Sequence, residues 1–84
     1  MAEENSFKIM VDVLCVHYKS GHIKPLQVIW NDGRRFEVDK VISLDKHASV
    51  KSGGVGLRYT CMIQGQKRYL YLQDDNSWFI EKAD

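Results

Sequence analysis

The chain has 84 residues, a formal net charge of +1, 44% hydrophobic and 27% charged residues. This length predicts a single domain over residues 1–84 and excludes a dinucleotide-binding α/β domain, a TIM barrel or a two-domain enzyme, all of which need longer chains. The composition is typical of globular proteins, so we expect disorder only in a tail over residues 1–6.

The N-terminal segment predicts a cytoplasmic protein. Residues 1–6 contain Glu3 and Glu4 and no basic residue, whereas a secretory signal begins with positive charge and continues with a long apolar run. Charged and polar side chains interrupt the apolar segment 7–18, so it does not predict a transmembrane span. Because a disulfide framework in so short a chain needs more than two cysteines, we expect both thiols to be reduced.

The small net charge conceals an uneven distribution along the chain. Residues 34–68 contain eight Lys or Arg and three acidic residues, whereas the rest of the chain contains four basic and eight acidic residues. A basic middle segment can form a polar binding face, and it can equally be an ordinary solvated surface.

Period-two alternation and β-branched or aromatic residues predict an all-β protein. The first strand is expected over residues 7–18, followed by a turn at residues 20–22. Pro25 has no backbone N–H to donate, so we expect it at the start of the second strand, which covers residues 26–30. The third strand is expected over residues 35–44.

The segment between the second and third strands predicts a hairpin with a three-residue loop, Asn31–Gly33. A two-residue loop would place the apolar face of one strand opposite the charged face of the other, because a shift of one residue exchanges the two faces. The three-residue loop instead pairs Val28 with Phe36 and Leu26 with Val38. This loop type requires a positive φ at Gly33 and a G1 bulge.

Residues 45–56 are rich in glycine and predict a long loop, followed by strands over residues 57–63, 67–73 and 78–81. A type II′ turn with Gly65 and Gln66 as central residues would pair Cys61 with Leu70 and Tyr59 with Leu72. The expected fold is a five- to six-stranded antiparallel meander that forms a small SH3-like or OB-like barrel or half-barrel.

A set of short motifs is spread over about residues 10–82, namely Gly21, Pro25, Val28-Ile29-Trp30, Asp32-Gly33-Arg34, Phe36, Val38, Gly53-Gly54-Val55-Gly56, Arg58-Tyr59-Thr60-Cys61 and Trp78-Phe79. With these motifs the chain resembles a group of small bacterial all-β proteins of unassigned function, mostly from Firmicutes. The resemblance implies a small all-β fold and no particular activity.

No motif predicts catalysis or a cofactor. Cys15, His17, His47 and Cys61 lack the local spacing of a zinc site, and nothing brings Cys61, His47 and Asp45 together as a nucleophilic triad. The glycine-rich segment 51–56 has its Lys and Ser before the glycines and precedes a strand, so it does not fit a P-loop, although a backbone anion nest is an alternative to a plain connector. We therefore expect a protein that is not an enzyme and holds no metal.

The strongest candidate binding site is the outward face of the fourth and fifth strands. It combines positive charge with aromatic and methionine side chains from Arg58, Met62, Lys67, Tyr69 and Tyr71. Such a face suits a protein partner or a homodimer, a single-stranded nucleic acid, or internal packing against another layer. Trp30, Phe36 and Trp78 are expected to anchor the core, with an aromatic pocket as the alternative.

Overall fold

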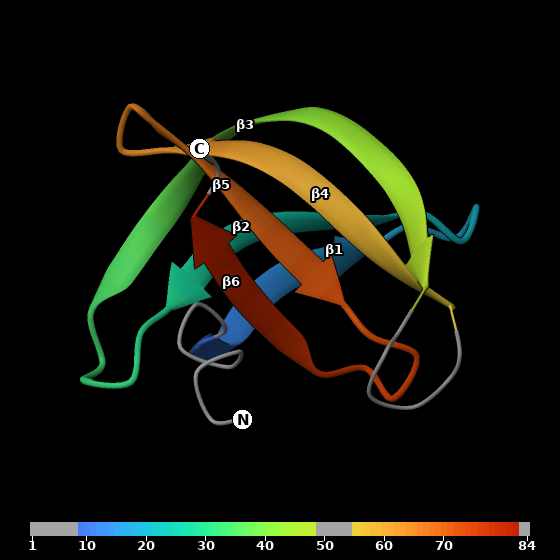
Figure 1. The fold of residues 1–84 in the computed structure, drawn as a ribbon, viewed down its shortest axis with the longest axis horizontal. Helices are drawn as coiled ribbons and strands as arrows, with labels where there is room; N and C mark the ends of the chain where they lie inside the picture. The colour runs from blue at the N-terminus through green and yellow to red at the C-terminus, as the bar shows by residue number, and fades with distance from the viewer. Residues whose placement is uncertain (1–8, 49–54, 83–84) are drawn as a thin grey trace.

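The fold is a closed barrel of six antiparallel strands (Figure 1). The computed structural model describes residues 9–48 and 55–82. Within these ranges there is no helix, and the strands are β1 (Ile9–His17), β2 (Ile23–Ile29), β3 (Arg35–Ala48), β4 (Val55–Ile63), β5 (Gln66–Leu72) and β6 (Trp78–Lys82). The predicted all-β fold is confirmed, and it is a complete barrel rather than a half-barrel.

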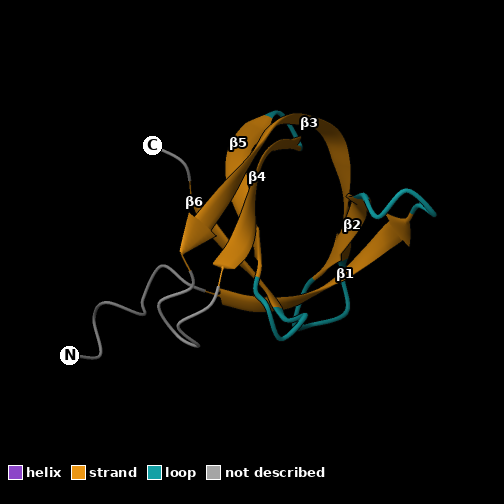
Figure 2. Ribbon diagram, turned by 90° about the vertical axis from the view of Figure 1, so that its right-hand side faces the viewer, coloured by secondary structure: helices purple, strands orange, loops and turns teal. Residues whose placement is uncertain are grey.

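Each strand pairs with the next one in the sequence, and pairing of β6 with β1 closes the ring. The long strand β3 joins the two sides of the barrel, because it pairs with β2 only at its first residues and with β4 from Val38 onward. Register irregularities between Val38 and Lys40 and between Val41 and Ser43 accompany this change of partner. Figure 2 shows the resulting curvature, with the strands arranged around a common interior.

Alternation along the strands, interrupted at the irregularities of β1–β2 and β3–β4, fills the barrel with one set of side chains and leaves the other set outside. The buried residues that form the core cluster are Val11, Val28, Tyr59, Cys61, Ile63, Leu70, Leu72, Trp78 and Ile80. The innermost tyrosine is Tyr59, which is 2% exposed. Its hydroxyl donates a hydrogen bond of 2.6 Å to the carbonyl of Ile23, so β4 is joined to the start of β2.

The predicted three-residue hairpin loop is confirmed. Val28 pairs with Phe36, and Gly33 has a φ of 91°. The backbone N–H of Gly33 bonds to the carbonyl of Trp30, and the N–H of Trp30 bonds to the carbonyl of Arg34. The predicted pair of Leu26 with Val38 does not form, because the β2–β3 ladder is confined to residues 27–29 of β2.

Two other hairpins use the same loop geometry. Gly21, with a φ of 99°, occupies this position between β1 and β2, and Asn76, with a φ of 70°, occupies it between β5 and β6. Asparagine tolerates the left-handed region better than most residues with a Cβ, which explains why it can replace glycine here.

The predicted turn between β4 and β5 is wrong by one position. Its two central residues are Gln64 and Gly65, with φ values of 53° and 74°, so it is a type I′ turn rather than type II′. Consequently Tyr59 pairs with Leu70 and Cys61 with Arg68, which is a register shift of two residues from the prediction. Because side chains alternate with a period of two, this shift leaves every residue on its predicted face.

Two further predictions need correction. Pro25 is not at a strand start but is a buried residue within β2, where the β1–β2 register shifts between Leu14 and Cys15. Proline is accepted at such a bulge because the ladder is interrupted there. The predicted loop over residues 45–56 is shorter, because β3 continues to Ala48 and β4 begins at Val55, while residues 49–54 and the predicted tail over residues 1–6 lie outside the described residues.

The positive φ at Gly33 predicts a specific order of stability among variants. Gly33→Val should lower the free energy of unfolding by about 1–2 kcal/mol, because a β-branched residue is strained in this conformation. Gly33→Asn should cost less, because Asn76 already occupies the equivalent position in another hairpin. Chemical denaturation measures both values, and equal stability of the two variants would contradict the loop assignment.

The buried hydroxyl of Tyr59 gives a second prediction. Tyr59→Phe should lower the free energy of unfolding by about 1–3 kcal/mol, because the carbonyl of Ile23 loses its buried donor. The matched control is Tyr18→Phe, at a tyrosine that is 47% exposed, which should change stability by less than about 0.5 kcal/mol. Similar effects at both positions would show that the hydrogen bond does not contribute to the free energy of unfolding.

Candidate binding surfaces

The structure brings the five predicted site residues together on the outer surface of β4 and β5. Arg58 lies directly opposite Tyr71, and Met62 lies opposite Lys67. Tyr69 lies between these two pairs, opposite Thr60. Lys67 is exposed and the other four predicted residues are half-buried, so this surface is not covered by a second sheet of the described barrel.

The aromatic rings of this surface pack against one another and continue onto β6. Tyr71 stacks on Phe79 with 4.5 Å between ring centroids and 13° between planes, and Tyr69 meets Tyr71 edge-on at 6.3 Å. The guanidinium of Arg58 lies over Tyr69, 4.9 Å from the ring centroid. Phe79 also pairs with Met10 of β1, which is 45% exposed.

We call this surface the outer aromatic face, consisting of Met10, Arg58, Met62, Lys67, Tyr69, Tyr71 and Phe79. Phe79 is only 7% exposed, so it supports the ring of Tyr71 rather than offering contact area itself. The prediction from sequence missed Phe79 and Met10. The alternation of residues 78–81 contains the signal for Phe79, because Trp78 and Ile80 on either side of it face the core. Met10 could not be assigned without knowing that β1 and β6 pair.

Carboxylates balance the positive charge of the outer aromatic face. The Nη2 of Arg58 lies 3.3 Å from Oδ2 of Asp45, and this hydrogen bond raises the pKa of the guanidinium above its ordinary value. Tyr71 donates a hydrogen bond of 3.1 Å to Glu81. Burial, followed by the negative charge of Glu81, raises the pKa of Tyr71, so its hydroxyl stays protonated at neutral pH.

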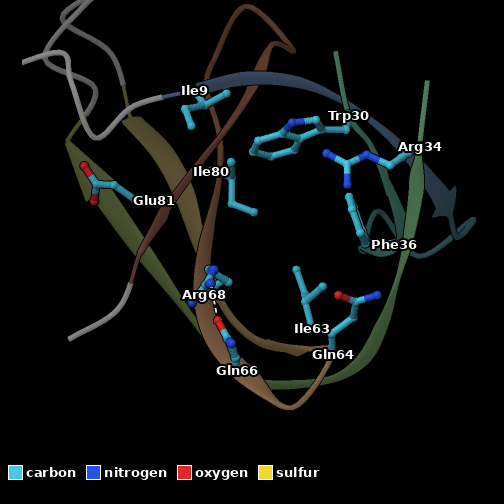
Figure 3. Close-up of a pocket in the computed structure, with 10 residues that line it drawn as sticks. All are labelled: Ile9, Trp30, Arg34, Phe36, Ile63, Gln64, Gln66, Arg68, Ile80 and Glu81. Atoms are coloured by element: carbon cyan, nitrogen blue, oxygen red, sulfur yellow. Dashed lines mark hydrogen bonds between the residues drawn. The ribbon is translucent and has the colours of Figure 1, made fainter. Parts of the chain in front are cut away.

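A second candidate surface is a pocket at one mouth of the barrel, with a volume of about 400 Å³ (Figure 3). Its apolar lining consists of Ile9, Trp30, Phe36, Ile63 and Ile80, and its polar lining consists of Arg34, Gln64, Gln66, Arg68 and Glu81. The three aromatic residues that were predicted to anchor the core therefore do not all lie in it. Trp78 is buried in the core against Tyr59, whereas Trp30 and Phe36 are partly buried and line the mouth.

The arrangement of the cysteines is unlike that of a nucleophilic triad or a metal site. Cys61 is fully buried inside the barrel, and Asp45 forms its ion pair with Arg58 on the outside. Among the described residues, no group of three or more His, Cys, Asp or Glu side chains could hold a metal ion. The side chain of His47 and most of the segment 51–56 lie outside the described residues.

Burial raises the pKa of Cys61 to about 12, which predicts an unreactive thiol. The thiolate is the reactive form, so at pH 8 a disulfide reagent such as DTNB should modify Cys61 only after unfolding. A Cys15→Ser variant, which retains only Cys61, should be silent when folded and release one equivalent of the chromophore in denaturant. Modification of the folded variant at the rate of the unfolded chain would contradict this placement.

Comparison with protein-family models, with curated proteins and with solved structures finds no match to this chain. The part of the chain that the structure describes contains no helix long and apolar enough to cross a membrane.

Proposed function

We propose that this protein is a small, non-catalytic binding module that recognises a protein surface, either a partner or a second copy of the chain, through the outer aromatic face. The observation that carries the proposal is the cluster of Tyr69, Tyr71 and Phe79 packed beside Arg58 on the outside of the barrel. Tyrosine, phenylalanine, methionine and arginine are enriched in the centres of protein interfaces. The cluster is preorganised, because its side chains already hold one another in place, which reduces the entropy lost on binding.

The contacts within the outer aromatic face favour a protein over a single-stranded nucleic acid. Base stacking needs a free ring face, but Tyr71 is stacked on Phe79 and Tyr69 lies under the guanidinium of Arg58. Phosphates would also approach the carboxylates of Asp45 and Glu81, which already interact with this face. Mixed charge around an aromatic centre is instead typical of a protein interface with a polar rim.

Two free thiols support the cytoplasmic location that the sequence predicts, because cytoplasmic proteins are kept reduced. The resemblance to small Firmicutes proteins leads us to propose a bacterial origin as well.

A tyrosine substitution on the outer aromatic face tests the proposal. We expect Tyr69→Ser to weaken self-association, or capture of a protein partner from lysate, by about tenfold or more, because truncating a central aromatic residue removes a binding hot spot. The matched control is Tyr18→Ser at an exposed tyrosine outside this face. Sedimentation measures self-association, and affinity capture with quantification measures partner binding.

Each variant must retain a cooperative melting transition, so that a loss of binding is not a loss of folding. Nuclease treatment and 0.5 M salt should leave binding unchanged. Binding that disappears with nuclease, or that falls steeply with salt, would replace the protein partner with a nucleic acid. Equal effects of Tyr69→Ser and Tyr18→Ser would show that the outer aromatic face is not the binding site.

A further inference from the structure

The pocket at the barrel mouth is lined by residues that do not belong to the outer aromatic face. A volume of about 400 Å³ lies within the range of small-molecule sites, which is about 300–1,000 Å³. Such sites are mostly apolar and contain a few polar groups that orient the ligand. The mouth pocket meets both conditions, with an apolar wall and two arginines.

Two aromatic rings, set nearly at right angles, form a corner of the apolar wall. Trp30 and Phe36 meet edge-on, with 6.3 Å between ring centroids and 84° between ring planes. Both remain partly exposed, unlike the buried Trp78 of the core. Figure 3 shows Trp30 and Phe36 on one side of the pocket, with Ile80 and Ile63 lining the remainder. A flat apolar group would cover the surface that these side chains leave open to water.

Arg34 lies at the rim of this wall, where its side chain is 65% exposed and is oriented by Asp32. Asp32 accepts a bond of 2.7 Å from the Nε of Arg34 and another of 3.1 Å from its backbone N–H. These bonds, the backbone one foremost, lower the pKa of Asp32, so the carboxylate that holds Arg34 stays charged at neutral pH. The guanidinium also lies 5.6 Å from the centroid of the Phe36 ring. Figure 3 shows it between Trp30 and Phe36 and directed into the pocket.

Arg68 supplies a second positive charge from the inward face of β5. It lies on the same face of β5 as Leu70 and Leu72 of the core, and it lines the pocket at the open end of the barrel. Its guanidinium donates hydrogen bonds to two neutral acceptors, the carbonyl of Lys67 and the side chain of Gln66. Within the described part of the chain, no ion pair joins Arg68 to a carboxylate. Glu81, at the edge of the pocket, instead accepts a hydrogen bond from Tyr71.

We propose that the mouth pocket binds a small organic acid with a flat apolar body. The body contacts Trp30 and Phe36, and its carboxylate accepts charge-assisted hydrogen bonds from Arg68, with Arg34 as the second cation. Guanidinium groups match the planar geometry of a carboxylate, and such bonds are stronger than neutral ones. An acid of about two fused rings fits a site of this size.

Protein-observed NMR titration with 2-naphthoate tests this proposal directly. We expect saturable shifts at the amides of the barrel mouth and at the indole N–H of Trp30. The neutral isostere 2-naphthamide should bind about tenfold more weakly, because it lacks the charge that the two arginines recognise. Arg68→Gln should weaken naphthoate binding by a similar factor and reduce the difference between acid and amide.

The matched control is Arg35→Gln, which removes the same charge from an exposed arginine that neighbours Arg34 but does not line the pocket. It should bind naphthoate like the native protein. If Arg68→Gln does not fold, Arg34→Gln provides the same comparison. Tyr69→Ser should leave naphthoate binding unchanged, so this proposal and the proposed protein interface can fail independently.

Three results would overturn the proposal. The first is equal affinity for the acid and the amide, which would mean that the arginines take no part. The second is the absence of saturable shifts at the mouth up to millimolar naphthoate. The third is tighter binding of an apolar peptide with a free C-terminal carboxylate than of naphthoate, which would identify the occupant as a protein tail.

Discussion

Closure of the ring by pairing of β6 with β1 is the constraint on which the rest of this structure depends. Six strands enclose room for a single set of inward side chains, so each strand alternates between core and surface except at the register irregularities of β1–β2 and β3–β4. Tyr59 is the clearest consequence, because it is both nearly inaccessible and hydrogen-bonded to the backbone of β2. A tyrosine fits there because its ring fills the interior while its hydroxyl donates a hydrogen bond to the carbonyl of Ile23.

The same closure explains how the outer aromatic face forms. Tyr69 and Tyr71 lie on β5, Phe79 on β6 and Met10 on β1, and these strands are adjacent only because the sheet is continuous around the barrel. The rings stack on one another and Arg58 lies over them, so the cluster is partly covered by its own members. This arrangement limits the apolar surface offered to water while keeping a rigid, amphipathic surface available for a partner.

The two tryptophans show how position along the barrel determines the role of a side chain. Trp78 packs against Tyr59 in the core and is 7% exposed. Trp30 directly follows β2, where the barrel opens and the interior is no longer filled. Arg68 is tolerated on an inward face for the same reason, because its long side chain reaches the open mouth.

For β4 and β5, the sequence by itself determined which residues face the core and which face outward. Alternation and the glycine at position 33 were sufficient to predict the length of the Asn31–Gly33 loop. The outward placement of Arg58, Tyr69 and Tyr71 followed from alternation alone. Alternation could not, however, distinguish the observed β4–β5 register from one shifted by two residues, because both place each side chain on the same face.

Only the tertiary structure decided how these faces are combined. The extension of β3 to Ala48 requires β4 as a partner, and the contact of Phe79 with Met10 requires the closing pair of strands. The pocket at the mouth likewise joins Arg34 and Arg68 from opposite parts of the sequence. Local patterns depend on neighbours along the chain, whereas these contacts depend on the curvature and closure of the whole sheet, which no single segment encodes.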